Sequence, residues 1–270
     1  MSIKLDGIQK TLLIPLWSRA KLSEGVNPII MDSMALKIID RIDYDFKDIE
    51  NNIPYFTKLM LVVRALEIDR KIKEYILNHP KATIISLGCG LDTAFYRIDN
   101  GMISWYDVDL PDVIKIRERL ISENRRNTNI SGSIFEIDWV KKIQANNEGM
   151  LIISGGVLPY FKKSMIKYLF NNIINNFKNS EIVFDTQSIL GNVVSNIGTQ
   201  IKGMKSANFQ WGIKDARTME KWDARIVFVE QYPLFSKTNI DKSWSKGIKT
   251  ITNLSDKFNM ANIVHLRISD

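Results

Sequence analysis

From about residue 82 onward, short apolar runs alternate with amphipathic stretches, and this alternation restricts the possible fold more than any other feature. Nearly all-apolar runs predict strands that are buried on both faces, and the helical patterns between most of them predict crossover helices. We therefore expect a doubly wound α/β fold with a parallel sheet, in which the last two of seven strands form an antiparallel edge. The predicted strands are Thr83–Leu87, Ile103–Val108, Ser133–Ile137, Met150–Ser154, Glu181–Asp185, Arg225–Tyr232 and Asn262–Ile268.

Helical patterns fill much of the remaining chain. Residues 1–80 form a predicted helical extension, in which apolar residues from Phe56 to Leu77 recur at helical spacing before Asn78-His79-Pro80 ends the run. Further helices are expected over Pro111–Asn124, Ser164–Phe177 and Ser243–Asn259.

A long segment, residues 187–223, separates the fifth and sixth predicted strands and has a helical pattern of its own. Doubly wound folds bind ligands at the carboxyl ends of their strands, so an insertion after a strand is well placed to cover the site. We expect a helical lid there, with an ordinary packing elaboration as the alternative. No repeat or Pro/Gly-rich linker divides the chain, which predicts a single domain over residues 1–270.

Composition narrows the class of protein. No apolar run reaches the roughly 18 residues of a membrane span, and the first residues lack the apolar core of a signal peptide. Cys89 is the single cysteine and excludes an internal disulfide, so we expect a cytoplasmic enzyme without membrane contact. The net charge of +7 is scattered, which favours a solvated surface over a nucleic-acid-binding one. The two histidines and the cysteine show no zinc-binding spacing, so we expect no metal.

A glycine turn follows the first predicted strand, in the segment Leu87-Gly88-Cys89-Gly90-Leu91-Asp92-Thr93. Glycine permits a tight turn, and its missing side chain lets a ligand lie against the backbone. A dinucleotide-binding fingerprint would need a third glycine where this chain has Thr93. A pyrophosphate needs close access to the following helix N-terminus, whereas S-adenosylmethionine has no phosphate to place there. The missing third glycine therefore argues against a dinucleotide, and the glycine turn alone is weak evidence for any one cofactor.

Acidic residues follow the next two predicted strands. An acid about 20 residues beyond the glycines can accept hydrogen bonds from both ribose hydroxyls. Asp107 and Asp109 face the same way along a strand, so either can reach, although Asp109 suits equally well as the cap of the helix near Pro111. Asp138 and Trp139 follow the third predicted strand, where an acid can bind the adenine amino group while the ring packs on the base.

Several short motifs in combination are far more specific than the glycine turn alone. They are Gly88-x-Gly90-Leu91-Asp92-Thr93, Trp105-Tyr106-Asp107-Val108-Asp109-Leu110-Pro111 followed by Arg117, Asp138-Trp139, Gly156-Val157-Leu158-x-Tyr160, residues 11–16 and residues 41–46. In this combination the chain resembles the leucine carboxyl methyltransferase superfamily, particularly its bacterial branch of tetracenomycin-type polyketide O-methyltransferases. The resemblance covers most of residues 10–235. It implies a class I methyltransferase-like fold and S-adenosylmethionine as the cofactor.

The resemblance also implies roles for individual residues. The family often places Glu where this chain has Gly155, which leaves the backbone as the expected contact at that position. The residues expected to bind the cofactor are Arg64 (methionyl carboxylate), Gly88 and Gly90 (lining), Asp109 (ribose), Asp138 and Trp139 (adenine) and Gly155.

We accordingly expect an O-methyltransferase that acts on a carboxylate or phenolic hydroxyl of a small, polyketide-like molecule. No sequence motif indicates a general base, so the catalytic residues stay unassigned. We expect the protein to promote methyl transfer mainly by holding the acceptor close to the cofactor. Tyr160 and Trp211 are the candidate substrate-binding residues. The alternatives are a protein carboxyl methyltransferase acting on a chain terminus and a non-catalytic cofactor-binding regulator. Gly155 supports the second alternative, because the family often has Glu at this position. A small-molecule acceptor is the expected partner, and a homodimer is the assembly we consider.

Overall fold

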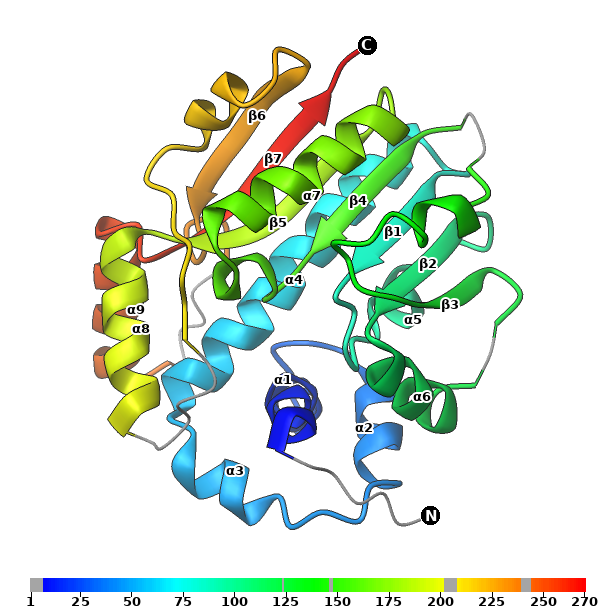
Figure 1. Ribbon diagram of the computed structural model, residues 1–270. Coiled ribbons are helices and arrows are strands. Elements are labelled where there is room, and N and C mark those ends of the chain that lie inside the picture. The colour runs from blue at the N-terminus through cyan, green and yellow to red at the C-terminus, as the bar shows by residue number, and fades with distance from the viewer. Residues whose placement is uncertain (1–6, 123, 146–147, 202–207, 239–243) are drawn as a thin grey trace.

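The computed structural model describes residues 7–122, 124–145, 148–201, 208–238 and 244–270. The chain forms a seven-stranded sheet in the order β3-β2-β1-β4-β5-β7-β6, with helices on both faces (Figure 1). β7 runs antiparallel to both of its neighbours, β5 and β6, so the predicted antiparallel edge is confirmed. The strands are β1 (Thr83–Leu87), β2 (Ser104–Asp109), β3 (Asn127–Ser131), β4 (Met150–Ser154), β5 (Glu181–Gln187), β6 (Ile226–Pro233) and β7 (Ala261–Ile268).

Helices account for most of the remaining described residues, and the one predicted from Phe56 to Leu77 is the long α4. None of the helices within the described residues is long and apolar enough to cross a membrane. The α-helices are α1 (Gly7–Leu22), α2 (Ser33–Ile39), α3 (Lys47–Asn52), α4 (Tyr55–Asn78), α5 (Ala94–Ile98), α6 (Pro111–Leu120), α7 (Lys163–Asn176), α8 (Ile189–Ile201) and α9 (Lys246–Lys257), and the 3-10 helices are η1 (Val140–Lys142), η2 (Leu158–Tyr160) and η3 (Ala216–Lys221).

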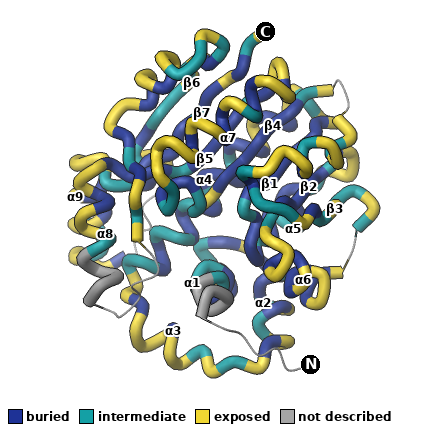
Figure 2. Tube along the Cα trace, viewed as in Figure 1, coloured by how far each residue is buried: buried dark blue, intermediate teal, exposed yellow. Residues whose placement is uncertain are grey.

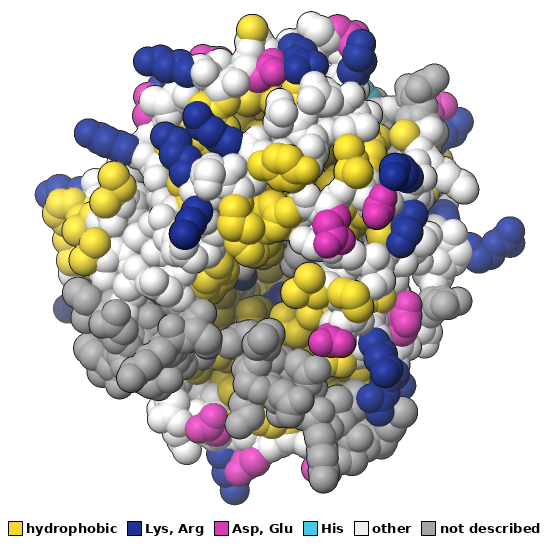
Figure 3. Space-filling view, viewed as in Figure 1, with side chains coloured by type: hydrophobic (Ala, Val, Ile, Leu, Met, Phe, Trp, Pro, Cys, Tyr) yellow, Lys and Arg dark blue, Asp and Glu magenta, His cyan; other side chains and the backbone are white. Residues whose placement is uncertain are grey.

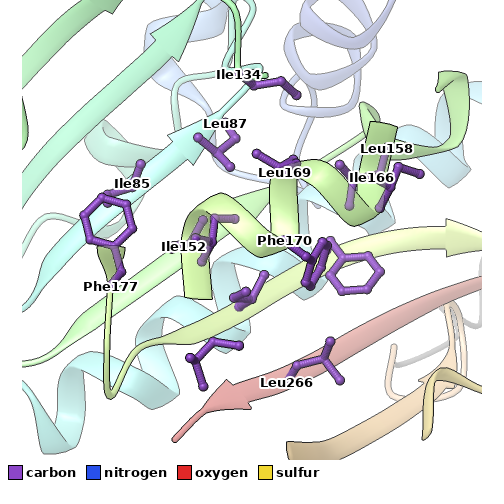
Figure 4. Close-up of a cluster of buried hydrophobic side chains, with 14 of the residues drawn as sticks. Ile85, Leu87, Ile134, Ile152, Leu158, Ile166, Leu169, Phe170, Phe177 and Leu266 are labelled. Atoms are coloured by element: carbon purple, nitrogen blue, oxygen red, sulfur yellow. The ribbon is translucent and has the colours of Figure 1, made fainter. Parts of the chain in front are cut away.

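The two faces of the sheet pack against different helices because successive strand side chains point to opposite sides. Ile85 of β1 lies in the core that includes α7, whereas its neighbour Ile84 lies in the core that includes α4. Figure 4 shows the α7 side, where Leu169 and Phe170 meet residues of β1, β4 and β7. The central strands are buried along their length, while the outer faces of the helices are exposed (Figure 2). Burial on both faces explains why β1 and β4 are nearly all apolar.

The third predicted strand is wrong. β3 occupies Asn127–Ser131, and the predicted segment Ser133–Ile137 follows it as a loop. β3 has β2 as its one neighbouring strand among the described residues and forms one edge of the sheet, and Ile130 is its one buried residue. An edge strand with solvent on its free side needs few apolar side chains, so the apolar pattern of the following loop was the misleading signal.

The topology creates a crevice at the carboxyl end of β1. β1 lies between β2 and β4, with Thr83 level with both Ser104 and Met150, so all three strands end at the same edge of the sheet. The chain leaves β1 for one neighbour and later returns to the other, which is the switch point where doubly wound folds bind ligands.

Two additions surround this crevice. Helices α1, α2 and α3 form a separate apolar cluster that also includes Leu91 of the glycine turn and residues of α6. The insertion between β5 and β6 contains α8 and η3, and its residues 202–207 lie outside the described part. The predicted N-terminal helices and helical insertion are therefore present, while the action of the insertion as a lid stays a prediction.

Candidate functional site

A cavity of about 390 Å³ lies at the switch point, within the volume range of small-molecule sites. In the space-filling view it lies at the hollow near the centre of the visible face, among hydrophobic side chains (Figure 3). Its walls come from α1, α4, the turns after β1 and β4, and the segment between α8 and η3. The lining residues are Leu12, Pro15, Leu16, Arg19, Leu61, Arg64, Ala65, Ile68, Gly88, Cys89, Gly90, Leu91, Asp92, Gly155, Gly156, Tyr160, Asn208 and Gln210.

The glycine turn after β1 forms the floor of this cavity. Gly88 and Gly90 both have positive φ, +67° and +51°, which side chains other than glycine rarely adopt. A Cβ at Gly88 would lie 2.5 Å from Cγ2 of Val157, so the turns after β1 and β4 can approach this closely only without a side chain. The close approach leaves backbone as the surface on which a ligand can lie.

Asp109, at the end of β2, braces the same turn. Its Oδ2 accepts a hydrogen bond of 2.7 Å from the Gly90 N–H, and its Oδ1 accepts one of 2.7 Å from the Leu110 N–H. Burial raises the pKa of this carboxyl above its usual value. Asp107, the alternative, is buried and already bound by Arg117 at 2.5 Å and by the indole N–H of Trp105 at 2.9 Å. Each acid accepts two hydrogen bonds, but Asp107 is buried whereas Asp109 is only partly buried, so Asp109 is the acid whose remaining lone pairs a ligand can reach.

Arg64 of α4 reaches the cavity beside the turn after β4. Its guanidinium lies against Gly156, whose φ is +75°, and a Cβ there would come within 2.5–2.7 Å of the guanidinium atoms. Nη1 of Arg64 pairs with Oδ2 of Asp185 at 3.5 Å. This places a guanidinium at the cavity wall beside the turn after β4, where an anionic group of a ligand can bind its remaining donors.

A buried ionic cluster beneath the glycine turn was not predicted. The Asp32 carboxylate accepts hydrogen bonds from Arg19 Nε at 2.9 Å, Thr93 Oγ1 at 2.6 Å and Arg97 Nη1 at 2.8 Å. Arg97 also binds Asp69 of α4 at 2.6 Å. Burial alone would raise the pKa of Asp32, but the charges of Arg19 and Arg97 outweigh it and lower the pKa. The cluster ties the N-terminal helices to the start of α5.

Tyr160 of η2 is the aromatic residue among the described cavity lining, and the segment between α8 and η3 packs against it. The rings of Tyr160 and Phe209 stack at 4.7 Å, and Asn196 of α8 binds both the N–H and the C=O of Phe209. The backbone N–H groups of Gln210 and Trp211 donate to Pro159. These bonds hold Asn208 to Gln210 at the cavity wall.

The structure brings together part of the predicted site. Arg64, Gly88, Gly90, Gly155 and Tyr160 all line the cavity. Asp109 does not line it but touches its floor through the hydrogen bond from the Gly90 N–H.

The other predicted residues lie elsewhere. The Trp139 indole is buried in the core on the α7 side, where it packs on Phe177 and donates to the Ile134 carbonyl, so any contact with a ligand would come from its backbone. Asp138 is exposed and pairs with Lys141. Trp211 is buried against Phe184 and Trp222 rather than at the cavity. The apolar character of both tryptophans was visible in the sequence, but not the face of the sheet that each one covers.

Sequence reasoning missed three charged residues of the site. Arg19 and Asp92 line the cavity, and Asp185 holds Arg64. The sequence contains only a weak indication that Arg19 belongs to a site, namely a charged residue that follows a mostly apolar stretch of α1. Asp185 was assigned only as the end of a strand, because its partners lie 29 and more residues away in the chain.

Comparisons with known proteins identify the family and the fold. A family model for leucine carboxyl methyltransferase matches residues 13–174. The chain is 30% identical to the tetracenomycin polyketide synthesis O-methyltransferase TcmP of Streptomyces glaucescens, covering 94% of this chain and 95% of that one. It is 28% identical to the S-adenosyl-L-methionine-dependent methyltransferase dpfgK of Gibberella zeae, over 96% and 93% of the two chains. The crystal structure of a proposed methyltransferase from Thermobifida fusca shares the fold, with a TM-score of 0.61, 12% identity, and coverage of 96% and 95%.

Proposed function

Because the chain belongs to the leucine carboxyl methyltransferase family and is an S-adenosylmethionine-dependent methyltransferase, we propose that it methylates a carboxylate of a small, aromatic acceptor. The observation that carries the choice of carboxylate is that none of the described lining residues suits a general base. The aromatic character of the acceptor rests on the Tyr160 ring, which lines the cavity and stacks on Phe209, and on the similarity to a polyketide O-methyltransferase.

The residues at the switch point fit the cofactor. Gly88 and Gly156 let Val157 and the Arg64 guanidinium pack directly against backbone, and the Arg64 guanidinium at the cavity wall is placed to bind the methionyl carboxylate. Asp109 would accept hydrogen bonds from the ribose, with Gly90 holding its carboxylate in place. Asp138, exposed in the loop after β3, remains our candidate for the adenine amino group. The cofactor supplies an activated methyl group on its sulfonium sulfur, so the protein has to orient the acceptor and exclude water.

None of the described lining residues suits a general base near neutral pH. Burial alone would raise the pKa of Asp92, but Arg97 and Arg19 outweigh it and hold the pKa well below its usual range. Burial raises the pKa of both the Cys89 thiol and the Tyr160 phenol. A phenolic acceptor with a pKa near 10 would need a base, whereas a carboxylate is already ionised.

The two histidines lie away from the cavity. His79 follows α4 and stacks on Tyr75, and His265 of β7 binds Glu181 at the start of β5. Arg19 and Arg64 line the cavity instead, but each is paired with an aspartate, Asp32 and Asp185, so the choice of acceptor rests on the lack of a base among the described lining residues. Together these placements support a carboxylate rather than a phenol. A homodimer and a cytoplasmic location remain predictions.

The test uses acceptors that carry both groups on one ring system, such as 3-hydroxy-2-naphthoate, with methyl-labelled S-adenosylmethionine. A methyl ester releases labelled methanol in mild alkali, whereas a phenolic ether does not. We expect alkali-labile label. Alkali-stable label would contradict the choice of carboxylate, and cofactor binding without transfer across a set of such acids would favour the non-catalytic regulator.

A further inference from the structure

The Arg64 guanidinium is held by a contact that lies outside the cavity lining. Asp185, near the end of β5, accepts a hydrogen bond from the Gly156 N–H through Oδ1 and pairs with Arg64 through Oδ2. One carboxylate therefore joins a helix of the N-terminal extension to the turn after β4. Both side chains are largely buried, with 20% of Arg64 and 13% of Asp185 exposed.

We infer that Asp185 is a positioning residue for the amino-acid end of the cofactor. It fixes the Arg64 guanidinium in the orientation that binds the methionyl carboxylate, and it fixes the Gly156 turn against which that guanidinium lies. This inference rests on the proposed role of Arg64.

The geometry explains why Asp185 does not simply block Arg64. A guanidinium has five N–H donors, and Asp185 pairs with Nη1 at 3.5 Å, which leaves other donors for a ligand. Gly156 covers one face of the guanidinium, so the group has little freedom to turn. A partner that locks a binding side chain lowers the entropy lost when the ligand binds.

The charges of the Arg64–Asp185 pair also match those of the amino-acid end of the cofactor. The amino-acid end of the cofactor carries a carboxylate and an ammonium, and the Arg64–Asp185 pair presents one charge of each sign. Removing Asp185 would reduce repulsion of the ligand carboxylate but also attraction of its ammonium. The two changes oppose each other, so the loss of positioning decides the outcome.

The experiment compares two ligands by calorimetry. S-adenosylhomocysteine contains the amino-acid end, and 5′-methylthioadenosine lacks it. We expect Asp185→Ala to weaken S-adenosylhomocysteine binding about tenfold, about 1.4 kcal/mol, and to change methylthioadenosine binding less than twofold. Asp185→Asn keeps an acceptor for Gly156 and should lose less. Arg64→Ala combined with Asp185→Ala should bind no more weakly than Arg64→Ala alone, because the two residues act as one unit.

Glu181→Gln is the matched control, since Glu181 lies at the other end of β5 in an ion pair with His265 and Arg267. It should leave the ratio of the two affinities unchanged. Equal weakening of both ligands by Asp185→Ala, or unchanged or tighter S-adenosylhomocysteine binding, would overturn the positioning role while leaving the proposed function intact. Failure of the wild-type protein to bind S-adenosylhomocysteine would overturn both.

Discussion

Asp32 provides a test of how the N-terminal helices hold the glycine turn. Its carboxylate is buried, caps α2 through the Ala35 N–H at 2.9 Å, and accepts hydrogen bonds from Arg19, Thr93 and Arg97. The change Asp32→Asn keeps the shape of the side chain but removes its charge. An amide can accept through one atom only, so the two guanidinium groups lose an anion that they share.

The magnitude follows from the burial of both partners. Breaking a buried ion pair by removing one member costs about 3–5 kcal/mol, because the other charge remains buried. Arg97 keeps its bonds to Asp69, so we expect the free energy of unfolding to fall by about 3 kcal/mol, at the lower end of that range. For a chain of this size the melting temperature should fall by roughly 6–12 °C.

Urea denaturation followed by tryptophan fluorescence measures this loss, with Asp138→Asn as control because Asp138 is an exposed acid paired with Lys141. The pKa of Asp32 is lowered in the folded protein, so its contribution is present above the unfolded pKa near 3.9 and is lost as the pH falls towards the folded value. The difference between wild type and Asp32→Asn should therefore shrink in acid. If Asp32→Asn were as stable as Asp138→Asn at neutral pH, the reasoning about the cluster would be refuted.

Three further substitutions test the cavity. Gly88→Ala places a Cβ 2.5 Å from Val157 at a φ of +67°, a backbone conformation that costs about 1–2 kcal/mol with a side chain present. Thermal melting should therefore show lower stability, and calorimetry should show weaker S-adenosylhomocysteine binding. Wild-type values in both measurements would contradict the close approach of the two turns. Tyr160→Ala removes the ring that stacks on Phe209 and should raise the KM for an aromatic acceptor at least severalfold. Tyr160→Phe keeps a ring and should leave the KM near that of wild type. Equal changes in KM for the two variants would argue against stacking. Asp138→Ala should weaken S-adenosylhomocysteine and methylthioadenosine binding to the same degree, and unchanged affinities would remove Asp138 from the adenine site.

The sequence was most informative where one local signal sufficed. β1 and β4 are buried on both faces, so their apolar runs predict their bounds, Thr83–Leu87 and Met150–Ser154, without error. Gly88 and Gly90 were predicted because a tight turn after a buried strand needs glycine, and the structure gives both a positive φ. β3 was missed because an edge strand with one buried residue has no such signal.

The rest of the site depends on contacts between distant parts of the chain. Asp32 lies 61 residues before Thr93 and 65 before Arg97, so no spacing rule relates them. The Arg64–Asp185 pair is likewise formed only when α4 crosses behind the sheet (Figure 1). Trp139 and Trp211 were predicted at the site from local sequence but pack in the core. An aromatic residue near a strand end can pack on the core as readily as on a ligand, and the local sequence does not distinguish the two.

The central claim is that the cavity at the glycine turn binds S-adenosylmethionine through Arg64 and Asp109. Calorimetry of the wild-type protein with S-adenosylhomocysteine, beside Arg64→Ala and Asp109→Ala, measures this most directly. The account predicts one binding site per chain and at least tenfold weaker binding in each folded variant. Unchanged affinity in both variants, or a wild-type protein that binds a dinucleotide but not S-adenosylhomocysteine, would contradict it.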